Sequence, residues 1–429
     1  MAPLPPPLRV RVGRFYAFTA ASSFAIWIPF WTLWIRRNVS SDFEFALVDV
    51  AFWLGVLVYQ LPVGILADRY GRKVAILLSE VFRTAGILGY GLSTAFVGYV
   101  VANLVWALGA AFSIGTTAYL YETLLEGRQE SEFPRYIGRY VMIALSVNAL
   151  GAFVGGVLVA VVPDVRLTMF VGAAWNLVTI AIVGLTFIEP KVERITEPTF
   201  TKQVGMGLRV FRRREGVALL IGLQVFIGVP LYAMSIFRPL YLRSLGFQDA
   251  DVAVSISAFL LVAALVSGLG GRLARVLGEF GTIVMFVLLA SASFLGMFGM
   301  GRFAAAAVLQ APLYVVWTLQ PALTTAFLNR RLEAGERATV LSIGAMAYTL
   351  GLVAVEPMAG LLTSTTEDLA VLGLFLGLLT FFPCAYILWK WRTTVAPWPA
   401  VTPVPSRLVG GGRVSRSHRL FERLSRPRP

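Results

Sequence analysis

The chain of 429 residues has little of what most enzyme and metal sites are built from. It contains one cysteine, Cys384, and one histidine, His418. A single cysteine excludes an intramolecular disulfide and a cysteine metal cluster, and the histidine stands in a terminal Arg-rich stretch, which excludes a histidine proton relay or metal site. A phosphate-binding loop of the Gly-x-x-x-x-Gly-Lys-Ser/Thr type is also missing, which argues against an ATP-driven pump. We therefore expect no enzymatic activity, no metal and no cofactor.

Charged side chains are scarce too. They make up 14% of the chain, against about a quarter in a soluble domain, whereas 57% of the residues are hydrophobic and the mean hydropathy is +0.75. The apolar residues form continuous runs of about 20, the length at which a helix crosses a hydrocarbon core about 30 Å thick. Continuous rather than alternating runs exclude a closed barrel. The composition thus predicts an all-α membrane protein.

Twelve such runs predict twelve transmembrane helices. Their approximate bounds are 15–35, 45–66, 74–93, 95–118, 138–162, 167–188, 217–238, 250–271, 282–300, 303–326, 340–362 and 369–389. Most of the 37 Lys and Arg fall in alternate loops and at the two chain ends. The loops on the other side hold only Arg36, Arg37, Arg166, Arg243 and Arg302. Short cytoplasmic loops carry the excess of Lys and Arg, so we expect a multi-pass protein of the plasma (inner) membrane with both termini in the cytoplasm.

The helices divide into two six-helix bundles. We expect a cytoplasmic segment at 1–14, bundles at 15–188 and 216–392, a basic cytoplasmic linker at 189–215 and a basic, disordered tail at 393–429. The tail could touch anionic lipid headgroups or stay solvated on the cytoplasmic side. The net charge of +14 then reflects the orientation of the protein in the membrane and not nucleic-acid binding. We expect the protein to be a monomer.

The loop between the second and third runs carries the most specific motif. It reads Leu61-Pro62-Val63-Gly64-Ile65-Leu66-Ala67-Asp68-Arg69-Tyr70-Gly71-Arg72-Lys73. Two glycines let the chain reverse, the cations retain the loop in the cytoplasm, and Asp68 is placed to pair with them. This segment closely resembles the signature loop of the major facilitator superfamily of secondary transporters.

The resemblance implies that the signature loop acts in gating, through Gly64, Asp68, Arg69, Gly71, Arg72 and Lys73. Asp68 would engage the partly positive N-terminus of the eleventh helix, near Arg337, through the helix dipole. With Arg69 and Arg72 it would latch the two halves together on the cytoplasmic side. The alternative is a purely topological role, as a turn that keeps its cations inside.

Weak internal sequence repetition supports the division of the chain into two related halves. Leu33-Trp34-Ile35-Arg36 matches Leu240-Tyr241-Leu242-Arg243, and the glycines of the signature loop match Gly271 and Gly278 at the same offset. In the second copy Arg275 replaces Asp68 and Glu279 replaces Arg72, so we expect this copy to be structural. Such symmetry is typical of duplicated transporter halves.

Three further segments resemble particular branches of the superfamily. Residues 328–331 with 337–342, and residues 118–124, are similar to bacterial members related to drug exporters. The run from Asn148 to Gly156 partly resembles the fifth-helix motif of antiporters, but it lacks the Gly-Pro pair of that motif. Close helix packing by Gly151 and Gly155 is enough to explain it.

Placing a charged side chain at the bilayer centre costs at least about 2.5–3.5 kcal/mol of free energy unless the charge is paired or hydrated. Charged residues within the predicted helices are therefore candidates for a functional role such as carrying a proton. Glu356, among apolar neighbours in the eleventh helix, could bind and release a proton, or could be hydrated near the outer membrane interface. Asp49 could substitute for the coupling acid that family members often carry in the first helix, or be interfacial. Glu80 and Arg83 could form an internal ion pair or belong to a proton path.

Candidate cavity residues are mostly aromatic or amide-bearing. Trp27 and Trp31 form a stripe on the first helix that either lines a cavity for a flat or cationic substrate or faces lipid. Arg238 could snorkel outward or attract an anionic substrate. The remaining candidates are Asn148, Gln224, Tyr232, Trp317, Gln320 and Tyr348.

The function expected from these features is alternating-access transport of a small molecule. The leading hypothesis is efflux of a small amphipathic organic compound driven by the proton gradient, because apolar helices with few fixed charges suit such substrates better than sugars or phosphates. The alternatives are a metabolite importer or facilitator on the same fold, and a membrane sensor or scaffold that uses the basic tail without transporting.

Overall fold

The structure is a computed structural model that describes residues 6–113, 115–191, 215–301, 304–332 and 334–394. The chain divides into one large unit, Met1–Ala396, and the stretch Pro397–Pro429, which lies wholly outside the described residues. Most of the expected linker and nearly all of the expected tail also lie outside them. All the described helices belong to the large unit.

Helices account for all the regular structure of the described ranges, which contain no strand. The amino-terminal half holds α1 (Pro6–Ser23), α2 (Trp31–Asn38), α3 (Asp42–Tyr70), α4 (Arg72–Leu92), α5 (Phe96–Phe112), α6 (Gly115–Glu126), the 3₁₀ turn η1 (Glu130–Glu132), α7 (Phe133–Val161) and α8 (Arg166–Thr186). The carboxy-terminal half holds α10 (Glu215–Ser244), α11 (Asp249–Ser267), α12 (Gly270–Met300), η2 (Ala304–Leu309), α13 (Gln310–Asn329), α14 (Ala334–Thr366) and α15 (Val371–Thr394).

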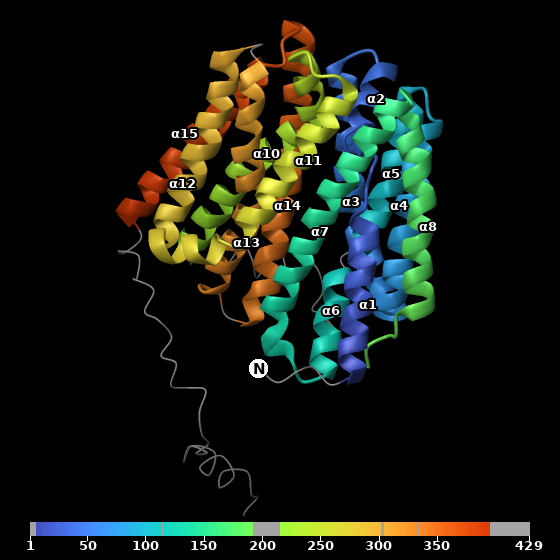
Figure 1. Cartoon of the computed structure of the whole chain (residues 1–429). Coiled ribbons are helices and arrows are strands. Elements are labelled where there is room, and N and C mark those ends of the chain that lie inside the picture. Colours follow the sequence, from blue (N-terminus) through green and yellow to red (C-terminus); the bar gives the residue numbers. More distant parts are fainter. Residues whose placement is uncertain (1–5, 114, 192–214, 302–303, 333, 395–429) are drawn as a thin grey trace, which may run out of the picture. The chain divides into compact units, whose positions relative to one another are not determined.

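The membrane spans follow from the length of these helices. Ten helical stretches are long and apolar enough to cross a membrane, with α5 and α6 counted together, and the bent helix α3 raises the number to eleven. The bend, 54° between 42–60 and 62–70, falls at Pro62, which lacks the N–H that an unbroken helix requires. α1 and α2 follow one another from the lower to the upper end of the bundle (Figure 1) and make the remaining span. The expected all-α membrane fold is confirmed.

The first span differs from the expected continuous helix, because residues 24–30 are not α-helical. Pro29 explains the break, since it lacks an N–H and disfavours the helical conformation of Ile28. The carbonyl groups freed at the end of α1 find donors on other helices. Trp175 Nε1 donates to Ala21 O at 2.8 Å, and Arg83 Nη2 donates to Ser22 O at 3.1 Å.

The glycines of α7 pack against this break and not against a regular helix. A Cβ atom on Gly155 would lie 2.3 Å from Ile26 O, and one on Gly151 would lie 2.9 Å from Ala25 N. Only a residue without a side chain allows the backbones to approach so closely. The small-residue spacing therefore serves the irregular segment of the first span.

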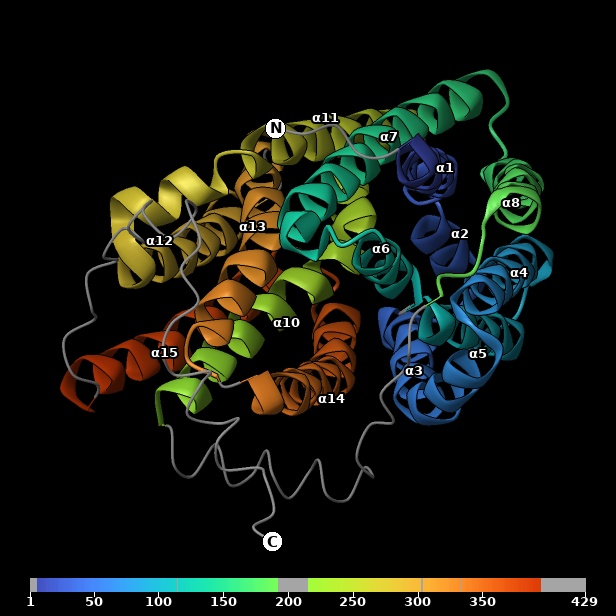
Figure 2. The same ribbon diagram turned by 90° about the horizontal axis from the view of Figure 1, so that it is seen from below.

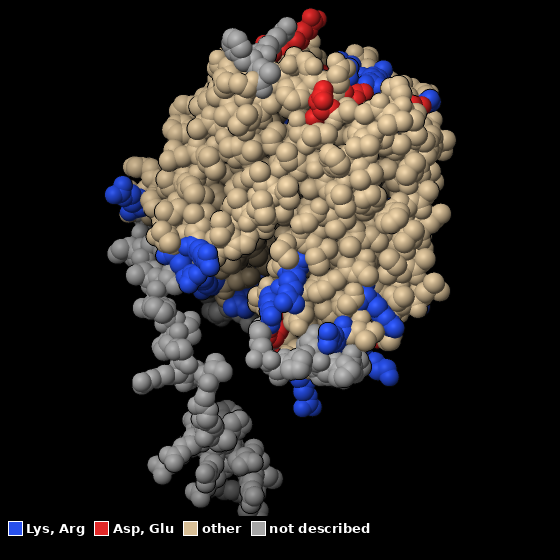
Figure 3. Space-filling model, in the orientation of Figure 1, with Lys and Arg blue, Asp and Glu red and all other residues tan. Residues whose placement is uncertain are grey.

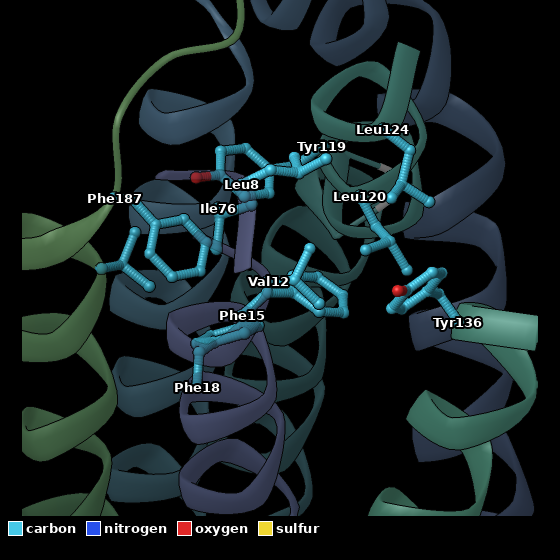
Figure 4. Close-up of a cluster of buried hydrophobic side chains, with 11 residues drawn as sticks. Leu8, Val12, Phe15, Phe18, Ile76, Tyr119, Leu120, Leu124, Tyr136 and Phe187 are labelled. Atoms are coloured by element: carbon cyan, nitrogen blue, oxygen red, sulfur yellow. The ribbon is translucent and has the colours of Figure 1, made fainter. Parts of the chain in front are cut away.

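The expected start of the first helix is also wrong, because α1 begins at Pro6 and the residues before Phe15 belong to it. Leu8 and Val12 pack with Phe15, Tyr119 and Leu124 in a buried cluster beneath α6 (Figure 4). Arg11 on the same helix forms an ion pair with Glu126 at 2.8 Å. Burial of these apolar side chains continues the helix into the segment expected to precede the first span.

The two halves meet along two pairs of helices. α7 lies beside α11, and α3 lies beside α14 (Figure 2). In the second pair Gly360 is pressed against α3, because a Cβ atom there would stand 2.5 Å from Asp42 O and 2.8 Å from Ala46 Cβ. We call the end of the bundle with Arg72 and Arg331 the basic end, and the end with Asp249 the far end.

Charged side chains avoid the middle of the surface. On the face drawn in Figure 3, Lys and Arg gather at the lower, basic end and most of the Asp and Glu at the upper, far end, with a broad uncharged belt between them. The surface is hollowed between the two halves at the basic end. An uncharged belt between two charged ends is what a hydrocarbon core requires.

Candidate functional site

Two buried carboxyl groups meet where the halves join. Asp49 on α3 is 2% exposed and Glu356 on α14 is 0% exposed. The two side chains are close enough to interact electrostatically with each other. Trp53 Nε1 donates to Asp49 Oδ2 at 3.2 Å, and Tyr232 on α10 also reaches Asp49. The sequence marked the two acids as alternatives, whereas the structure makes them one site shared by both halves.

The two carboxyl groups have few polar partners besides each other. Neither oxygen of Glu356 accepts a hydrogen bond from an N–H or O–H donor in the described part of the chain, so Asp49 is its polar partner. Two ionised carboxylates only accept, and side by side in a low-dielectric interior they repel each other. No ion pair joins either acid to a Lys or Arg of the described ranges. One proton held between the two carboxyl groups satisfies both.

Aromatic rings enclose the acid pair. Trp53 on α3 packs edge-on against Tyr232 and Tyr348 of the other half, with ring centroids 5.0 and 6.0 Å apart. Tyr348 interacts electrostatically with both acids. Trp53 was missed in the sequence, although its position four residues after Asp49 on a helix signals that the two share a face.

A cavity of about 410 Å³ lies in the carboxy-terminal half, between α10, α13 and α14. It is lined by Ile221, Gln224, Gly228, Trp317, Gln320, Pro321, Thr325, Leu328, Val340, Leu341, Gly344, Ala345 and Tyr348. Gln224, Trp317, Gln320 and Tyr348 were expected as cavity residues, and the structure brings them together here. Tyr232, expected with them, lies at the acid pair instead.

The tryptophan stripe of the first span lies in the core of the amino-terminal half. Trp27 and Trp31 are 4% and 8% exposed. Trp27 packs on Trp106 with centroids 5.2 Å apart, and Trp31 stacks on Tyr90 at 5.8 Å. Neither ring lines the cavity or the molecular surface, so both alternatives drawn from the periodicity are replaced by a third, packing against α4 and α5.

Two other candidates also lie away from the cavity. Arg238 does not snorkel, because it is 3% exposed. Its Cζ stands 3.9 Å from the centre of the Tyr314 ring, and its Nε donates to Gln310 Oε1 at 2.8 Å. Asn148 on α7 has a buried side-chain oxygen without a hydrogen-bond donor among the described residues.

Glu80 and Arg83 form an ion pair of 2.7 Å within α4. Arg83 also donates to Asn176 Oδ1 at 2.6 Å, and Thr179 Oγ1 donates to Glu80 at 3.1 Å. Together with the bond from Arg83 to the broken first span, these contacts tie α4 to α8 and to α1. The pair thus has structural partners on two other helices.

Several contacts of the signature loop lie within its own half. Asp68 pairs with Arg72 at 3.0 Å, and Arg72 Nε also binds Glu122 at 2.8 Å. Glu189 accepts from the backbone N–H groups of Arg72 and Lys73, which satisfies the first turn of α4.

The residues of the loop differ in their part in the turn. Gly71 has a φ of +101°, a conformation that favours glycine. Gly64 lies inside α3, so the expectation that both glycines make the turn is wrong. Arg69 stands over the Tyr70 ring at 5.5 Å, and Arg337 donates to Leu332 O in the other half.

The second copy of the loop inverts the signs of this network. Glu279, at the position matching Arg72, forms ion pairs with Arg330 and Arg331 at the end of α13. In the first copy the cation is Arg72, at the start of α4, and its acid is Glu122 on α6. In the second copy the acid is Glu279 on α12, and its cations, Arg330 and Arg331, follow α13. Each network joins two elements of a single half.

At the far end, by contrast, ion pairs cross between the halves. Asp249 binds Arg37 of the other half and Arg243 of its own, and Phe43 N donates to Ser364 Oγ at 3.0 Å. Hydrogen bonds from Arg166, with Arg37 nearby, hold the pKa of Asp164 in the adjoining loop below its usual range. That carboxylate is therefore charged at neutral pH, and it lies near the Arg37–Asp249 ion pair that crosses between the halves.

A membrane protein of two pseudo-symmetric six-helix halves has the architecture of a secondary transporter. The sequence profile of the Major Facilitator Superfamily matches residues 15–356, and the chain belongs to this superfamily.

Two curated relatives come from Bacillus subtilis. The multidrug resistance protein 1 is 29% identical over 217 residues, 49% of this chain and 53% of the relative, and the uncharacterized MFS-type transporter YxaM is 22% identical over 250 residues, 56% of this chain and 60% of the relative. The chain thus spans little more than half the length of these relatives.

Solved structures share the fold at low identity. The nucleoside transporter NupG superposes with a TM-score of 0.68 at 12% identity, covering 89% of this chain and 98% of that one. A bacterial homologue of the human lysosomal transporter Spinster, inward-facing and unoccupied, gives 0.71 at 16% identity, covering 90% and 98%. The D-xylose–proton symporter gives 0.68 at 13%, covering 90% and 97%.

Proposed function

We propose that this protein exports a small amphipathic organic compound across the plasma membrane in exchange for protons, by alternating access, with its basic end in the cytoplasm. The observation that carries the proposal is the buried contact between Asp49 and Glu356. These acids come from opposite halves, so the state of their shared proton bears directly on how the halves fit together.

The shared proton favours the arrangement that is closed at the far end. If both acids ionise, two charges about 4 Å apart repel by on the order of 4 kcal/mol at an effective dielectric constant of about 20. A difference of that size shifts a two-state equilibrium about a thousandfold. Loss of the proton therefore pushes α3 away from α14 and opens the far end. Binding of a proton from outside then closes the far end again.

Efflux is supported by the multidrug resistance relative and by the weakly polar cavity. The signature loop, at the basic end where the surface is hollowed between the halves (Figure 3), would latch the halves when they close there. Import is the second candidate function, supported by the nucleoside transporter and the xylose–proton symporter among the structural neighbours.

The test is transport into inverted vesicles of compounds from an amphipathic panel, with and without an imposed proton gradient. The wild type should accumulate a compound only with the gradient. Asp49→Asn and Glu356→Gln should abolish accumulation while keeping gradient-free exchange, because neither variant can gain and lose the shared proton.

Glu130→Gln, at an exposed carboxylate in the loop before α7, is the matched control and should behave as wild type. Gradient-driven accumulation by both acid variants would refute proton coupling at this pair. A compound taken up by right-side-out vesicles with the gradient would favour import.

A further inference from the structure

The cavity of the carboxy-terminal half has no charge of its own. None of its lining residues is Asp, Glu, Lys or Arg. Its volume of about 410 Å³ falls in the range of small-molecule sites, about 300–1,000 Å³. A charged ligand that gives up its water in such a site finds no opposite charge, which costs several kcal/mol.

The polar groups of the cavity wall suit an uncharged partner. In the described part of the chain no hydrogen bond is made by the Gln224 amide, the Trp317 indole N–H or the Tyr348 hydroxyl. Gln320 makes one long side-chain contact, Nε2 to Thr324 Oγ1 at 3.5 Å. The wall therefore offers amide donors and acceptors together with one indole ring.

The acid pair is separated from this cavity. Asp49 and Glu356 are fully buried and are not among the lining residues. Tyr348 stands between the two sites, since it lines the cavity and also packs on Trp53 beside the acids. A cation in the cavity would thus not replace the shared proton by direct contact with the carboxyl groups.

We propose, resting on the transport function proposed above, that the substrate is an uncharged, flat heteroaromatic compound bound in this cavity. Its ring stacks on Trp317, and its carbonyl and N–H groups bind Gln224 and Gln320. Substrate and proton occupy different sites, and Tyr348 is the wall through which one site affects the other.

Three tricyclic probes of nearly equal shape test the charge preference: neutral acridone, the cation N-methylacridinium and the anion acridine-9-carboxylate. Binding to the purified full-length protein at pH 7 is measured by fluorescence titration. Acridone should bind at least tenfold more tightly than either charged probe. Trp317→Ala and Gln320→Leu should each weaken acridone binding about tenfold, through lost stacking and a lost amide partner.

Controls separate the cavity from other aromatic sites. Trp389→Ala, at an exposed tryptophan of α15, should leave acridone binding unchanged. Gln224→Glu, which adds one charge to the wall, should reverse the preference toward N-methylacridinium.

Several results would overturn the proposal. Tighter binding of a charged probe, failure of all three probes to bind, or unchanged acridone binding in both Trp317→Ala and Gln320→Leu would each do so. Proton coupling is tested separately, by measuring gradient-driven flux. Failure of the proposed substrate class with intact proton coupling can therefore be distinguished from failure of proton coupling with intact acridone binding.

Discussion

The ion pair between Arg37 and Asp249 gives a prediction that can be worked out in magnitude. It is a charged contact between the halves at the far end, and the two side chains are 42% and 14% exposed. A partly exposed pair contributes up to about 1 kcal/mol after screening by solvent. Arg37→Gln removes it, so the ratio of far-end-closed to far-end-open molecules should fall about fivefold.

The neighbouring residue supplies the control. Arg36 pairs with Asp42 inside the amino-terminal half, so Arg36→Gln removes a similar charge without breaking a contact between halves. This variant should keep the wild-type ratio. High salt should move the wild type part of the way toward Arg37→Gln, because it screens the exposed pair.

Distances between spin labels measure the ratio. Ser40→Cys on one half and Thr366→Cys on the other place two exposed labels at the far end, and the native Cys384 is buried. Double electron–electron resonance then resolves the short distance of the closed form from the long one of the open form. An unchanged distance distribution in Arg37→Gln, or an equal change in Arg36→Gln, would refute the reasoning.

Three further predictions concern the loop, its copy and the aromatic core. Asp68→Asn should impair transport with normal membrane insertion, because it removes a charge at the end that must close, and wild-type flux in vesicles would contradict the gating role. Glu279→Arg should lower the thermal midpoint by leaving cations unpaired, and adding Arg331→Glu should recover part of the loss, whereas no recovery would argue against the inverted pair. Trp27→Ala should cost about 3–5 kcal/mol of stability through the cavity it leaves without changing acridone affinity, and weakened binding by folded protein would return this ring to the substrate site.

The membrane fold could be predicted because it depends on local properties. Apolar runs of spanning length and the placement of Lys and Arg need no knowledge of which helices touch. The break at 24–30 also had a local signal in Pro29, but the strong apolar run around it pointed to a continuous helix. Its stabilisation by Arg83 and Trp175 depends on tertiary contacts that no local pattern encodes.

The candidate site was predictable only in its parts. Asp49 and Glu356 each stood out as an acid in an apolar run, but their contact depends on α3 and α14 packing side by side from opposite halves. Periodicity placed Trp27 and Trp31 on one face of a helix, yet it cannot tell whether that face meets lipid, a cavity or the rings of α4 and α5. Pairing across halves is a property of the assembled bundle.

The shared proton between Asp49 and Glu356 is the centre of this account, and infrared difference spectroscopy of the purified protein tests it most directly. At pH 7 the wild type should show the carbonyl stretch of a protonated carboxyl group, shifted by exchange into ²H₂O. The double variant Asp49→Asn with Glu356→Gln should lose this band, whereas either acid left alone, buried without a cation, should stay protonated and keep it. A wild-type spectrum without the band, or a band of unchanged strength in the double variant, would contradict the account.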